Sequence, residues 1–262
     1  MTNGRLQDKV VILTGGTSGI GLAIVRLFCN EGAKVAIGAR NEKVGNELVK
    51  DIRKSGRGEA FYVKTDVTHP EQVENLVKQT VDHFGKVDVL VANSGVLILE
   101  SILELSLEEW ERTIATNLSG QFYLAKYGIP AMIKSDGKGK AVIFVGSELG
   151  TVGTTGGAAY CASKGGIINM TRAVAIDCAS YGIRVNCLAP GPIDTPMLQS
   201  EFTQAKDGEA VKQAQLQPLL IKRFGTAEEM AEVALFLATV SSSYMTGALV
   251  VADGGATTWY GM

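Results

Sequence analysis

A glycine-rich turn directly after the first apolar run constrains the fold of this chain more than any other feature. Residues 10–13 (Val-Val-Ile-Leu) predict a buried strand, and the turn at residues 14–21 (Thr-Gly-Gly-Thr-Ser-Gly-Ile-Gly) follows at once. Residues 21–30 then predict a helix. Glycines in such a turn lack the Cβ atom that would keep the backbone away from a bound group and the helix away from the strand. A strand, a glycine turn and a helix in this order predict the start of a parallel α/β sheet.

The rest of the chain repeats this alternation. Further strands are predicted over 34–39, 60–64, 87–92, 141–145, 184–188 and 248–252. Longer helices are predicted over 43–54, 70–84, 107–134, 158–181 and 227–238. No internal repeat or long linker divides the sequence. We therefore expect one α/β domain over residues 1–262, a doubly wound, Rossmann-like parallel sheet of about seven strands with helices on both faces.

Composition and charge narrow the classes of partner. Of the 262 residues, 46% are hydrophobic and 20% charged, which is enough to build a sizeable core. The net charge of -2 offers no electrostatic footprint for nucleic acid or an anionic membrane. The first nine residues are polar and lack the apolar core of a signal peptide, and the apolar runs are too short to span a membrane. We expect a cytoplasmic protein.

The cysteines and histidines show no pattern of a metal site. No CxxC pair occurs, and neither His69 nor His83 has ligand spacing with a cysteine. Reduced, mostly buried thiols are typical of a cytoplasmic protein. This expectation covers all four cysteines: Cys29, Cys161, Cys178 and Cys187.

The residues at the end of the second predicted strand indicate which dinucleotide, NADP(H) or NAD(H), would bind at the glycine turn. A pyrophosphate can bind the amides of a helix that follows a glycine turn, and ribose recognition comes roughly 20 residues later. An acidic residue there would bind the 2′-hydroxyl and repel a 2′-phosphate, but residues 39–41 are Ala-Arg-Asn. Because Arg40 can grip a phosphate, NADP(H) is favoured over NAD(H). In the alternative, Arg40 stacks on adenine or faces water, and NAD(H) stays usable.

Tyr160 and Lys164 stand one helical turn apart in the helix predicted over 158–181, so both side chains project from one face. A phenol normally titrates near pH ~10. A neighbouring ammonium group stabilises the phenolate and draws its pKa toward neutrality, where acid–base catalysis is efficient. Ser147 follows a predicted strand and could hydrogen-bond a substrate oxygen. Taken alone, a Tyr-x-x-x-Lys pair is equally typical of a solvated helix surface.

From residue 14 to residue 255, a series of motifs resembles the short-chain dehydrogenase/reductase family, in particular its single-domain members of about this length. The motifs are Thr14-Gly15-x-x-x-Gly19-x-Gly21, Asp66-Val67, Asn93-Ser94-Gly95 (with serine where the family has alanine), Asn117, Ser147, Tyr160-x-x-x-Lys164, Pro190-Gly191-Pro192-Ile193-Asp194-Thr195, Tyr244-Met245-Thr246-Gly247 and Val251-Ala252-Asp253-Gly254-Gly255. They occur in order and at family spacing. The resemblance implies a catalytic tetrad of Asn117, Ser147, Tyr160 and Lys164.

The resemblance also implies a set of cofactor contacts. They are Gly15, Thr17, Ser18, Gly19, Ile20, Gly21, Arg40, Asp66, Val67, Asn93, Ser94, Gly95, Tyr160, Lys164, Pro190, Gly191, Ile193 and Thr195. Within this set, the Asp66 carboxylate would accept a hydrogen bond from the adenine amine, and Ile193 and Thr195 would fix the nicotinamide carboxamide. In the alternative for Asp66, its side chain caps the helix predicted to begin at Pro70.

The resemblance further implies a reaction. A carbonyl oxygen would lie between Ser147 and Tyr160, hydride would pass from the nicotinamide to the carbonyl carbon, and Tyr160 would donate the proton. Lys164 would also bind the nicotinamide ribose and, with a water held by the Asn117 backbone, relay protons to solvent. We expect an NADP(H)-dependent oxidoreductase that interconverts a ketone and a secondary alcohol. The alternatives are a 3-oxoacyl-carrier-protein reductase, an NAD(H)-dependent alcohol or hydroxysteroid dehydrogenase, and a dinucleotide-sensing protein without turnover.

Two further segments, residues 151–157 and 197–224, are expected to shape the substrate pocket. Residues 151–157 are small and uncharged, which favours an apolar ketone, and only a thin basic rim is available to an acidic carrier protein. Residues 197–224 mix apolar and charged residues and are predicted to form an amphipathic substrate lid, or else an ordinary surface helix.

The family usually forms tetramers, and the apolar residues 259–262 suggest a C-terminus that packs against a neighbour. A homotetramer, or a homodimer, is expected.

Overall fold

Seven parallel strands form the centre of the protein, in the order β3-β2-β1-β4-β5-β6-β7. The computed structural model describes residues 4–259. The strands are β1 (Val10–Thr14), β2 (Lys34–Ala39), β3 (Glu59–Lys64), β4 (Val89–Ala92), β5 (Ala141–Val145), β6 (Arg184–Pro190) and β7 (Leu249–Ala252). The strand order reverses between β1 and β4, which makes the carboxyl edge there the natural ligand site of such a sheet. The doubly wound parallel sheet predicted from the sequence is confirmed.

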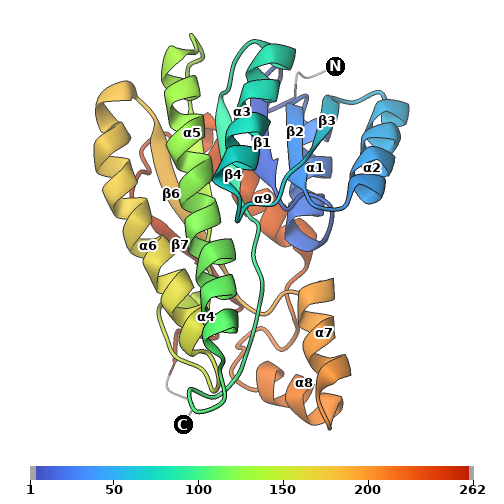
Figure 1. The fold of residues 1–262 in the computed structure, drawn as a ribbon, viewed down its shortest axis with the longest axis vertical. Coiled ribbons are helices and arrows are strands. Elements are labelled where there is room, and N and C mark those ends of the chain that lie inside the picture. Colours follow the sequence, from blue (N-terminus) through green and yellow to red (C-terminus); the bar gives the residue numbers. More distant parts are fainter. Residues whose placement is uncertain (1–3, 260–262) are drawn as a thin grey trace.

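Helices cover both faces of the sheet. One face packs against α1 (Gly19–Asn30), α2 (Glu42–Ser55) and α9 (Ala227–Ala238). The other packs against α3 (Pro70–Phe84), α5 (Gly120–Lys134) and α6 (Ala158–Cys178). In Figure 1 the second group lies in front of the sheet, while α1 and α9 lie behind it.

The apolar runs of the sequence arise because the strands are covered on both faces. Every residue of β1 is buried. Val11 and Leu13 pack against α1 and α9, whereas Ile12, which points the opposite way, packs into the second core. A strand buried on both faces reads as a continuous apolar run instead of an alternating one, which is why residues 10–13 are recognisable without structure.

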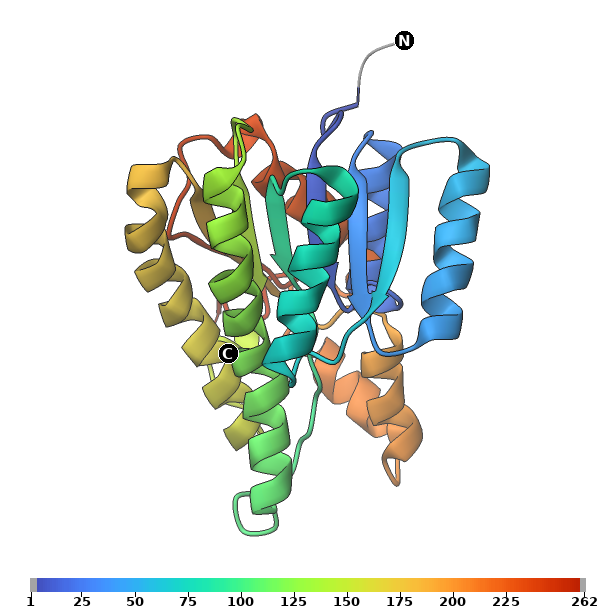
Figure 2. The ribbon, with the colours of Figure 1, turned by 45° about the horizontal axis from the view of Figure 1, so that its top comes forward.

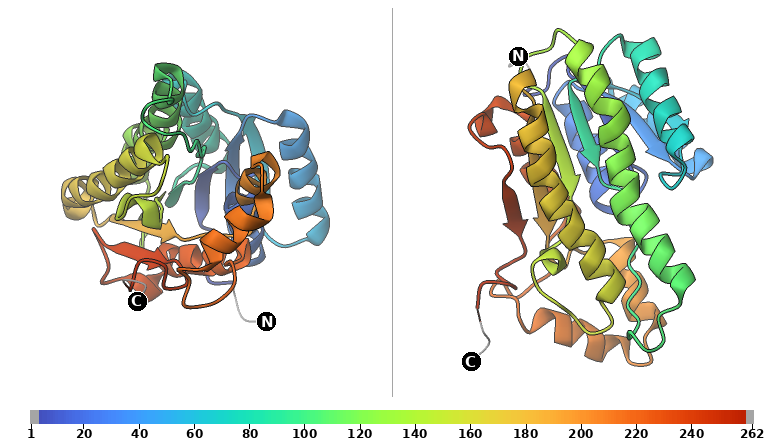
Figure 3. Two further views of the ribbon diagram at one scale, coloured as in Figure 1. Left: turned by 90° about the horizontal axis from the view of Figure 1, so that it is seen from below. Right: turned by 60° about the vertical axis from the view of Figure 1, so that its left-hand side comes forward.

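The helix predicted over 107–134 is interrupted by a π-helical segment. It consists of α4 (Leu107–Ile114), the π-turn η1 (Ala115–Ser119) and α5, joined end to end as one long rod in the right-hand view of Figure 3. Ser106 caps the start of α4 by accepting a hydrogen bond from the Glu109 amide at 3.2 Å. Single π-turns inside α-helices occur frequently at functional sites, and this one contains Asn117.

The strand predicted over 87–92 begins later, at Val89. Asp88, fully buried, accepts a hydrogen bond from the Val10 amide with its side chain, at 2.9 Å. A side-chain carboxylate thus takes a position that a strand carbonyl would otherwise fill. The long helix predicted over 158–181 ends at Cys178 and continues as a 3₁₀ turn, Ala179–Tyr181.

The segment predicted as a lid forms two short helices. These are α7 (Pro196–Gln204) and α8 (Gly208–Leu216), which project beyond the carboxyl ends of the strands (Figures 1 and 2). Phe202 of α7 stacks on Phe224, with ring centroids 5.8 Å apart. Within residues 4–259, none of the helices combines the length and the apolar character needed to cross a membrane.

Candidate active site

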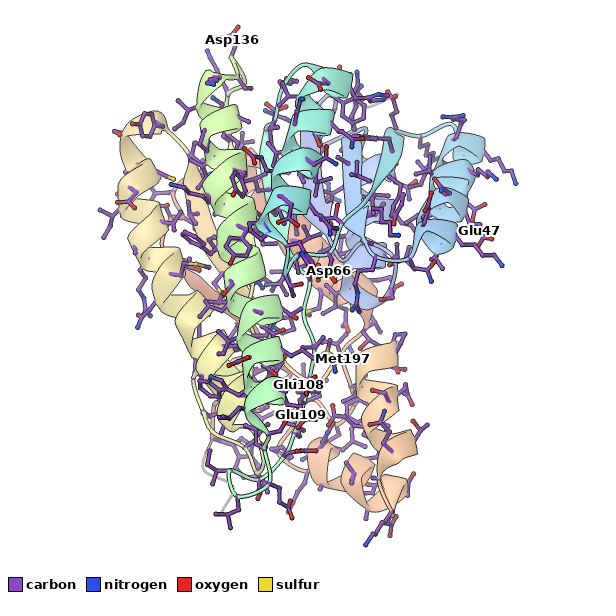
Figure 4. The ribbon with its side chains drawn as sticks, viewed as in Figure 1. Glu47, Asp66, Glu108, Glu109, Asp136 and Met197 are labelled. Carbon is purple, nitrogen blue, oxygen red and sulfur yellow. The ribbon has the colours of Figure 1, made fainter. Side chains whose placement is uncertain are left out.

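A cavity of about 1250 Å³ opens at the carboxyl edge of the sheet and extends beneath α7 and α8. Both Asp66 and Met197 line it; in Figure 4 Asp66 lies near the middle of the molecule and Met197 below it, while Asp136 lies at the top. All predicted cofactor contacts line this one cavity, together with Ser147. Segments far apart in the sequence therefore meet where the strand order reverses.

The glycine turn leaves backbone donors free for an anion. Gly15 and Gly19 have φ angles of 73° and 50°, which favour glycine. A Cβ on Gly21 would lie 2.1 Å from the Gly15 carbonyl oxygen, so a side chain there would separate turn and helix. Ser18 is the N-cap of α1 but makes no side-chain capping bond, and the first turn of α1 holds no acidic residue. The N-terminal amides of α1 thus fit the pyrophosphate of a dinucleotide.

Asp66 is held as an ionised acceptor. Its Oδ1 accepts hydrogen bonds from the Thr68 amide at 3.0 Å and the Thr68 hydroxyl at 2.8 Å. Burial acts to raise the pKa of Asp66, but these two bonds and the charge of Arg40 lower it overall. The N-cap of α3 is His69, so Asp66 does not cap that helix. Its geometry therefore suits a contact with an amine such as that of adenine.

At the end of β2 the cavity is lined by Ala39, Arg40 and Asn41. Asn41 is occupied as the N-cap of α2, where its Oδ1 accepts from the Val44 amide at 3.2 Å. Arg40 is exposed. Its guanidinium lies close enough to Asp66 to lower the pKa of that carboxyl. The positive charge of Arg40 thus lies at the position where a carboxylate would bind the ribose 2′-hydroxyl. A carboxylate there would repel a 2′-phosphate, and Arg40 would not.

Asn93 joins the two strand ends that bound the cavity. Its Nδ2 donates to the carbonyl oxygens of Thr14 at 3.2 Å and Gly15 at 3.1 Å. The Asn93 amide also donates to the Thr14 hydroxyl at 3.2 Å. The side chain thus fixes the glycine turn against the loop that carries Ser94 and Gly95.

Tyr160 and Lys164 lie in the first turns of α6, as predicted, and both are buried. The Lys164 Nζ lies 5.5 Å from the centre of the Tyr160 ring. It donates to the Val145 carbonyl oxygen at 3.0 Å, at the end of β5. Burial lowers the pKa of Lys164 to about 8, against the opposing influence of nearby Cys187 and Glu148. The lysine is therefore held in place by a strand end and easily loses its charge.

The expectation that Lys164 draws the pKa of Tyr160 down is wrong for this structure. Burial raises the pKa of Tyr160 above its ordinary value, the carboxylate of Glu148 raises it further, and only the Ser147 hydroxyl opposes the shift. Removing a phenol from water penalises the charged phenolate, and the charge of Lys164, itself destabilised by burial, is not among the groups that lower the pKa of Tyr160. The tyrosine is consequently held as a neutral proton donor.

Glu148, next to Ser147, is a buried cavity residue that the sequence analysis did not select. The Ser147 Oγ donates to the Glu148 Oε2 at 2.5 Å and accepts from the Leu149 amide at 3.2 Å. Glu201 of α7 and Gln215 of α8 also line the cavity, where Gln215 Nε2 donates to Glu201 Oε2 at 2.9 Å. Acidic residues in loops and surface helices carry no sequence signal of burial, which is why they were missed.

Asn117 is the predicted tetrad residue that does not line the cavity. It is fully buried in the π-turn. Its Oδ1 accepts from the Val96 amide at 2.8 Å, and its Nδ2 donates to the Val96 carbonyl oxygen at 2.9 Å and the Ser163 hydroxyl at 3.2 Å. These hydrogen bonds tie the Asn117 side chain to protein groups, so that it positions the loop after β4.

The C-terminal segment packs against its own chain at Trp259. The indole Nε1 of Trp259 donates to the Pro218 carbonyl oxygen at 2.8 Å, just after α8. Residues 260–262, also predicted to meet a neighbour, lie outside the described residues. Asp253 accepts from the Gly255 amide and from the amide and hydroxyl of Thr257, which makes it a turn residue just after β7.

Comparison with known proteins agrees with this arrangement. A sequence model for a family described as enoyl-(acyl carrier protein) reductase matches residues 15–257. The chain is 38% identical to a 3-oxoacyl-[acyl-carrier-protein] reductase of Chlamydia pneumoniae, covering 96% of this chain and 98% of the relative. It is also 38% identical to a cyclopentanol dehydrogenase of a Comamonas species, covering 97% and 99%.

A solved structure extends the likeness to three dimensions. A variant of a Serratia marcescens short-chain dehydrogenase/reductase superposes with a TM-score of 0.87 at 33% sequence identity, covering 97% of this chain and 99% of that one. Family model, relatives and structure agree over nearly the whole chain. The chain belongs to the short-chain dehydrogenase/reductase family and is an oxidoreductase of that family.

Proposed function

We propose that the protein interconverts a ketone and a secondary alcohol by hydride transfer with NADP(H), with Tyr160 as the acid–base group. The observation that carries the proposal is the convergence of Ser147, Tyr160 and Lys164 on the cavity that also contains the glycine turn. The hydroxyls of Ser147 and Tyr160 are close enough for one to affect the pKa of the other. A carbonyl oxygen between them can receive two hydrogen bonds and then a proton.

Each residue then has a distinct task. Ser147 orients the substrate oxygen, and Tyr160, held neutral, donates its proton to the developing alkoxide in the reductive direction. Lys164, whose Nζ donates to the Val145 carbonyl oxygen, would hold the nicotinamide ribose. When bound, the nicotinamide would supply the hydride and, in its oxidised form, a positive charge that favours the phenolate. The lid helices α7 and α8 exclude water from this step.

The preference for NADP(H) rests on the end of β2. Arg40 lines the cavity there, and Ala39 and Asn41 beside it carry no charge. A guanidinium binds a 2′-phosphate strongly, while the missing carboxylate weakens binding of a 2′-hydroxyl. NADP(H) is therefore the proposed cofactor, with NAD(H) as the weaker one.

We further propose a free ketone as substrate. The relative named as a cyclopentanol dehydrogenase supports an alicyclic ketone, and the relative named as a 3-oxoacyl-[acyl-carrier-protein] reductase supports a 3-oxoacyl thioester as the second candidate. Glu100 follows the cavity-lining Leu99, and its pKa is raised chiefly by the charge of Glu109. Negative charge near the cavity would repel an acidic carrier protein, so the free ketone is preferred.

The test follows the loss of reduced-cofactor absorbance with NADPH and NADH in parallel. The panel contains cyclopentanone, an aryl ketone, a diketone, a steroid ketone and a 3-oxoacyl thioester. Turnover of a free ketone with NADPH, abolished in Tyr160→Phe, is the expected result. Turnover of the thioester alone would replace the preferred substrate by the second candidate. Tight cofactor binding without turnover of any ketone would favour a sensing role and contradict the proposal.

We also propose a cytoplasmic homotetramer, or a homodimer. Large apolar side chains are exposed at the end of α6 and in and before the last strand, among them Ile176, Tyr181, Tyr244 and Val251. Exposed apolar groups of this size favour burial against another copy. Light scattering at micromolar concentration tests this, and a monomer would contradict it.

A further inference from the structure

The hydroxyl of Ser147 has one hydrogen, and while Glu148 is ionised that hydrogen is committed to Glu148, because a carboxylate can only accept. Ser147 Oγ donates to Glu148 Oε2 at 2.5 Å. The same oxygen accepts from the Leu149 amide at 3.2 Å, which occupies one of its two lone pairs. In this state Ser147 has no hydrogen left for a substrate oxygen. A carbonyl oxygen has no hydrogen of its own, so it cannot bind Ser147 unless that hydrogen is released.

Protonation of Glu148 releases the hydroxyl hydrogen of Ser147. A neutral carboxyl group carries an O–H, which can donate to the second lone pair of Ser147 Oγ. The Leu149 amide and the Glu148 O–H then fill both lone pairs, and the Ser147 hydrogen is free to point into the cavity. Hydrogen bonds in such a chain polarise one another, so the Ser147 hydroxyl also becomes a stronger donor. Glu148 takes up one proton from solvent, its hydrogen bond with Ser147 reverses direction, and the Ser147 O–H bond itself stays intact.

We propose, on the basis of the proposed function, that Glu148 is a positioning residue that must be protonated for Ser147 to bind the substrate oxygen. Ionised Glu148 competes with the substrate for the Ser147 hydrogen, and protonated Glu148 turns that hydrogen toward the substrate. Glu148 thus acts through Ser147 and does not touch the reacting carbon.

The surroundings of Glu148 favour its neutral form. Burial raises the pKa of Glu148 above that of an ordinary glutamate, and the charge of Asp253, after β7, raises it further. Hydrogen bonds from Ser147 and from the amides of Glu148 and Leu149 oppose the shift without cancelling it. Glu148 faces two residues of α6, Tyr160 and Lys164. Its negative charge raises the pKa of both.

The proposal predicts that ketone reduction slows as the pH rises. Below the pKa of Glu148 the carboxyl is neutral and Ser147 is available, so kcat/KM for ketone reduction is at its plateau. As the pH rises through that pKa, kcat/KM falls about tenfold per pH unit, as for any reaction that needs one protonated group. Deprotonation of Lys164 and of Tyr160 adds further limbs at higher pH.

The variant Glu148→Gln distinguishes the positioning of the Ser147 hydrogen from a general electrostatic role of Glu148. Glutamine keeps an N–H donor beside Ser147 at every pH, so we expect the first descending limb to disappear while the low-pH plateau stays within about threefold. A merely electrostatic Glu148 would shift the limbs of Lys164 and Tyr160 to lower pH without removing one. Glu201→Gln is the matched control, because it removes another cavity carboxyl that raises the pKa of Tyr160 but has no contact with Ser147 in the described structure. Its profile is expected to keep the first limb.

Ser147→Ala provides an independent test if Glu148→Gln does not fold. Its residual activity has no serine donor to release, so the first limb is expected to vanish there as well. A first limb that persists in either folded variant overturns the role of Glu148. Absence of ketone turnover in the wild-type protein overturns the proposed function instead, so the two failures are distinguishable.

Discussion

Asn117 and Val96 exchange two hydrogen bonds, from the Val96 amide to Asn117 Oδ1 at 2.8 Å and from Asn117 Nδ2 to the Val96 carbonyl oxygen at 2.9 Å. The pair ties the π-turn to the segment after β4. That segment lines the cavity with Ser94 and Gly95. The rim of the cavity therefore depends on a side chain that does not reach into it.

Replacing Asn117 by alanine should weaken both the fold and cofactor binding. Two backbone groups of Val96 lose their partners, which is expected to cost about 2–4 kcal/mol in free energy of unfolding. Because the loop after β4 loosens, the Kd for NADPH should rise as well. Urea unfolding and fluorescence titration measure the two effects. Asn169→Ala, which removes an exposed asparagine from α6, is the control and should leave both nearly unchanged. Wild-type cofactor affinity in Asn117→Ala would rule out the positioning role.

Replacing Tyr160 by phenylalanine should remove turnover and spare binding. Loss of a positioned proton donor typically costs ~10²–10⁴ in rate. The ring stays in place, so the Kd for NADPH is expected to change less than about threefold. Steady-state kinetics and cofactor titration on the same preparation test this. Tyr181→Phe, at an exposed tyrosine after α6, serves as the control. A near-normal rate in Tyr160→Phe would assign proton transfer to another group.

The parts of the fold that could be predicted from sequence are those in which local pattern and packing agree. Residues 10–13 are apolar throughout because β1 is buried on both faces. Gly21 is required because a Cβ would strike the Gly15 carbonyl oxygen. Tyr160 and Lys164 meet because helical geometry alone puts them on one face. For the glycine turn and the helical pair the cause lies within a few residues of the chain, and for β1 the burial is visible in the residue types themselves.

Other features depend on segments distant in sequence and could not be predicted. Residues 115–119 (Ala-Thr-Asn-Leu-Ser) suit an ordinary α-helix, and nothing local distinguishes the π-turn. Glu148 looks like a loop glutamate until it is buried against α6. The pKa of Tyr160 is set by burial and by Glu148 together, so the presence of Lys164 alone gave the wrong direction. Such balances are decided by tertiary packing.

Arg40→Ala should reduce the preference for NADPH. A guanidinium that binds a 2′-phosphate contributes about 1.5–3 kcal/mol, so the Kd for NADPH should rise roughly 10–100-fold, with little change for NADH. Calorimetric titration with both cofactors measures the ratio. Arg53→Ala removes an exposed arginine from the last turn of α2 and is the matched control. Equal losses for NADPH and NADH would show that Arg40 contacts the adenine and not a phosphate.

The buried Lys164 should make stability depend on pH in a defined window. Burial lowers its pKa from the ordinary 10.5 to about 8 in the folded protein. Between these values the unfolded chain binds more protons than the folded one, so the free energy of unfolding rises with pH there and is level below it. The gain across the window is roughly 3 kcal/mol. The neutral folded form is thus favoured only at alkaline pH.

Lys164→Met isolates this effect because it removes the titrating group and keeps an apolar side chain of similar length. The Val145 carbonyl oxygen still receives the Gln121 Nε2 donor at 2.9 Å, so no orphaned acceptor confuses the comparison. Urea unfolding of both proteins from pH 7 to pH 10.5 should show the wild-type free energy of unfolding rising relative to the variant, with no relative change below pH 8. Lys126→Met, at an exposed lysine of α5, controls for the loss of one positive charge. A difference between wild type and Lys164→Met that stays constant across the window would mean that Lys164 keeps its ordinary pKa, and the cavity would then hold a permanent positive charge at its centre.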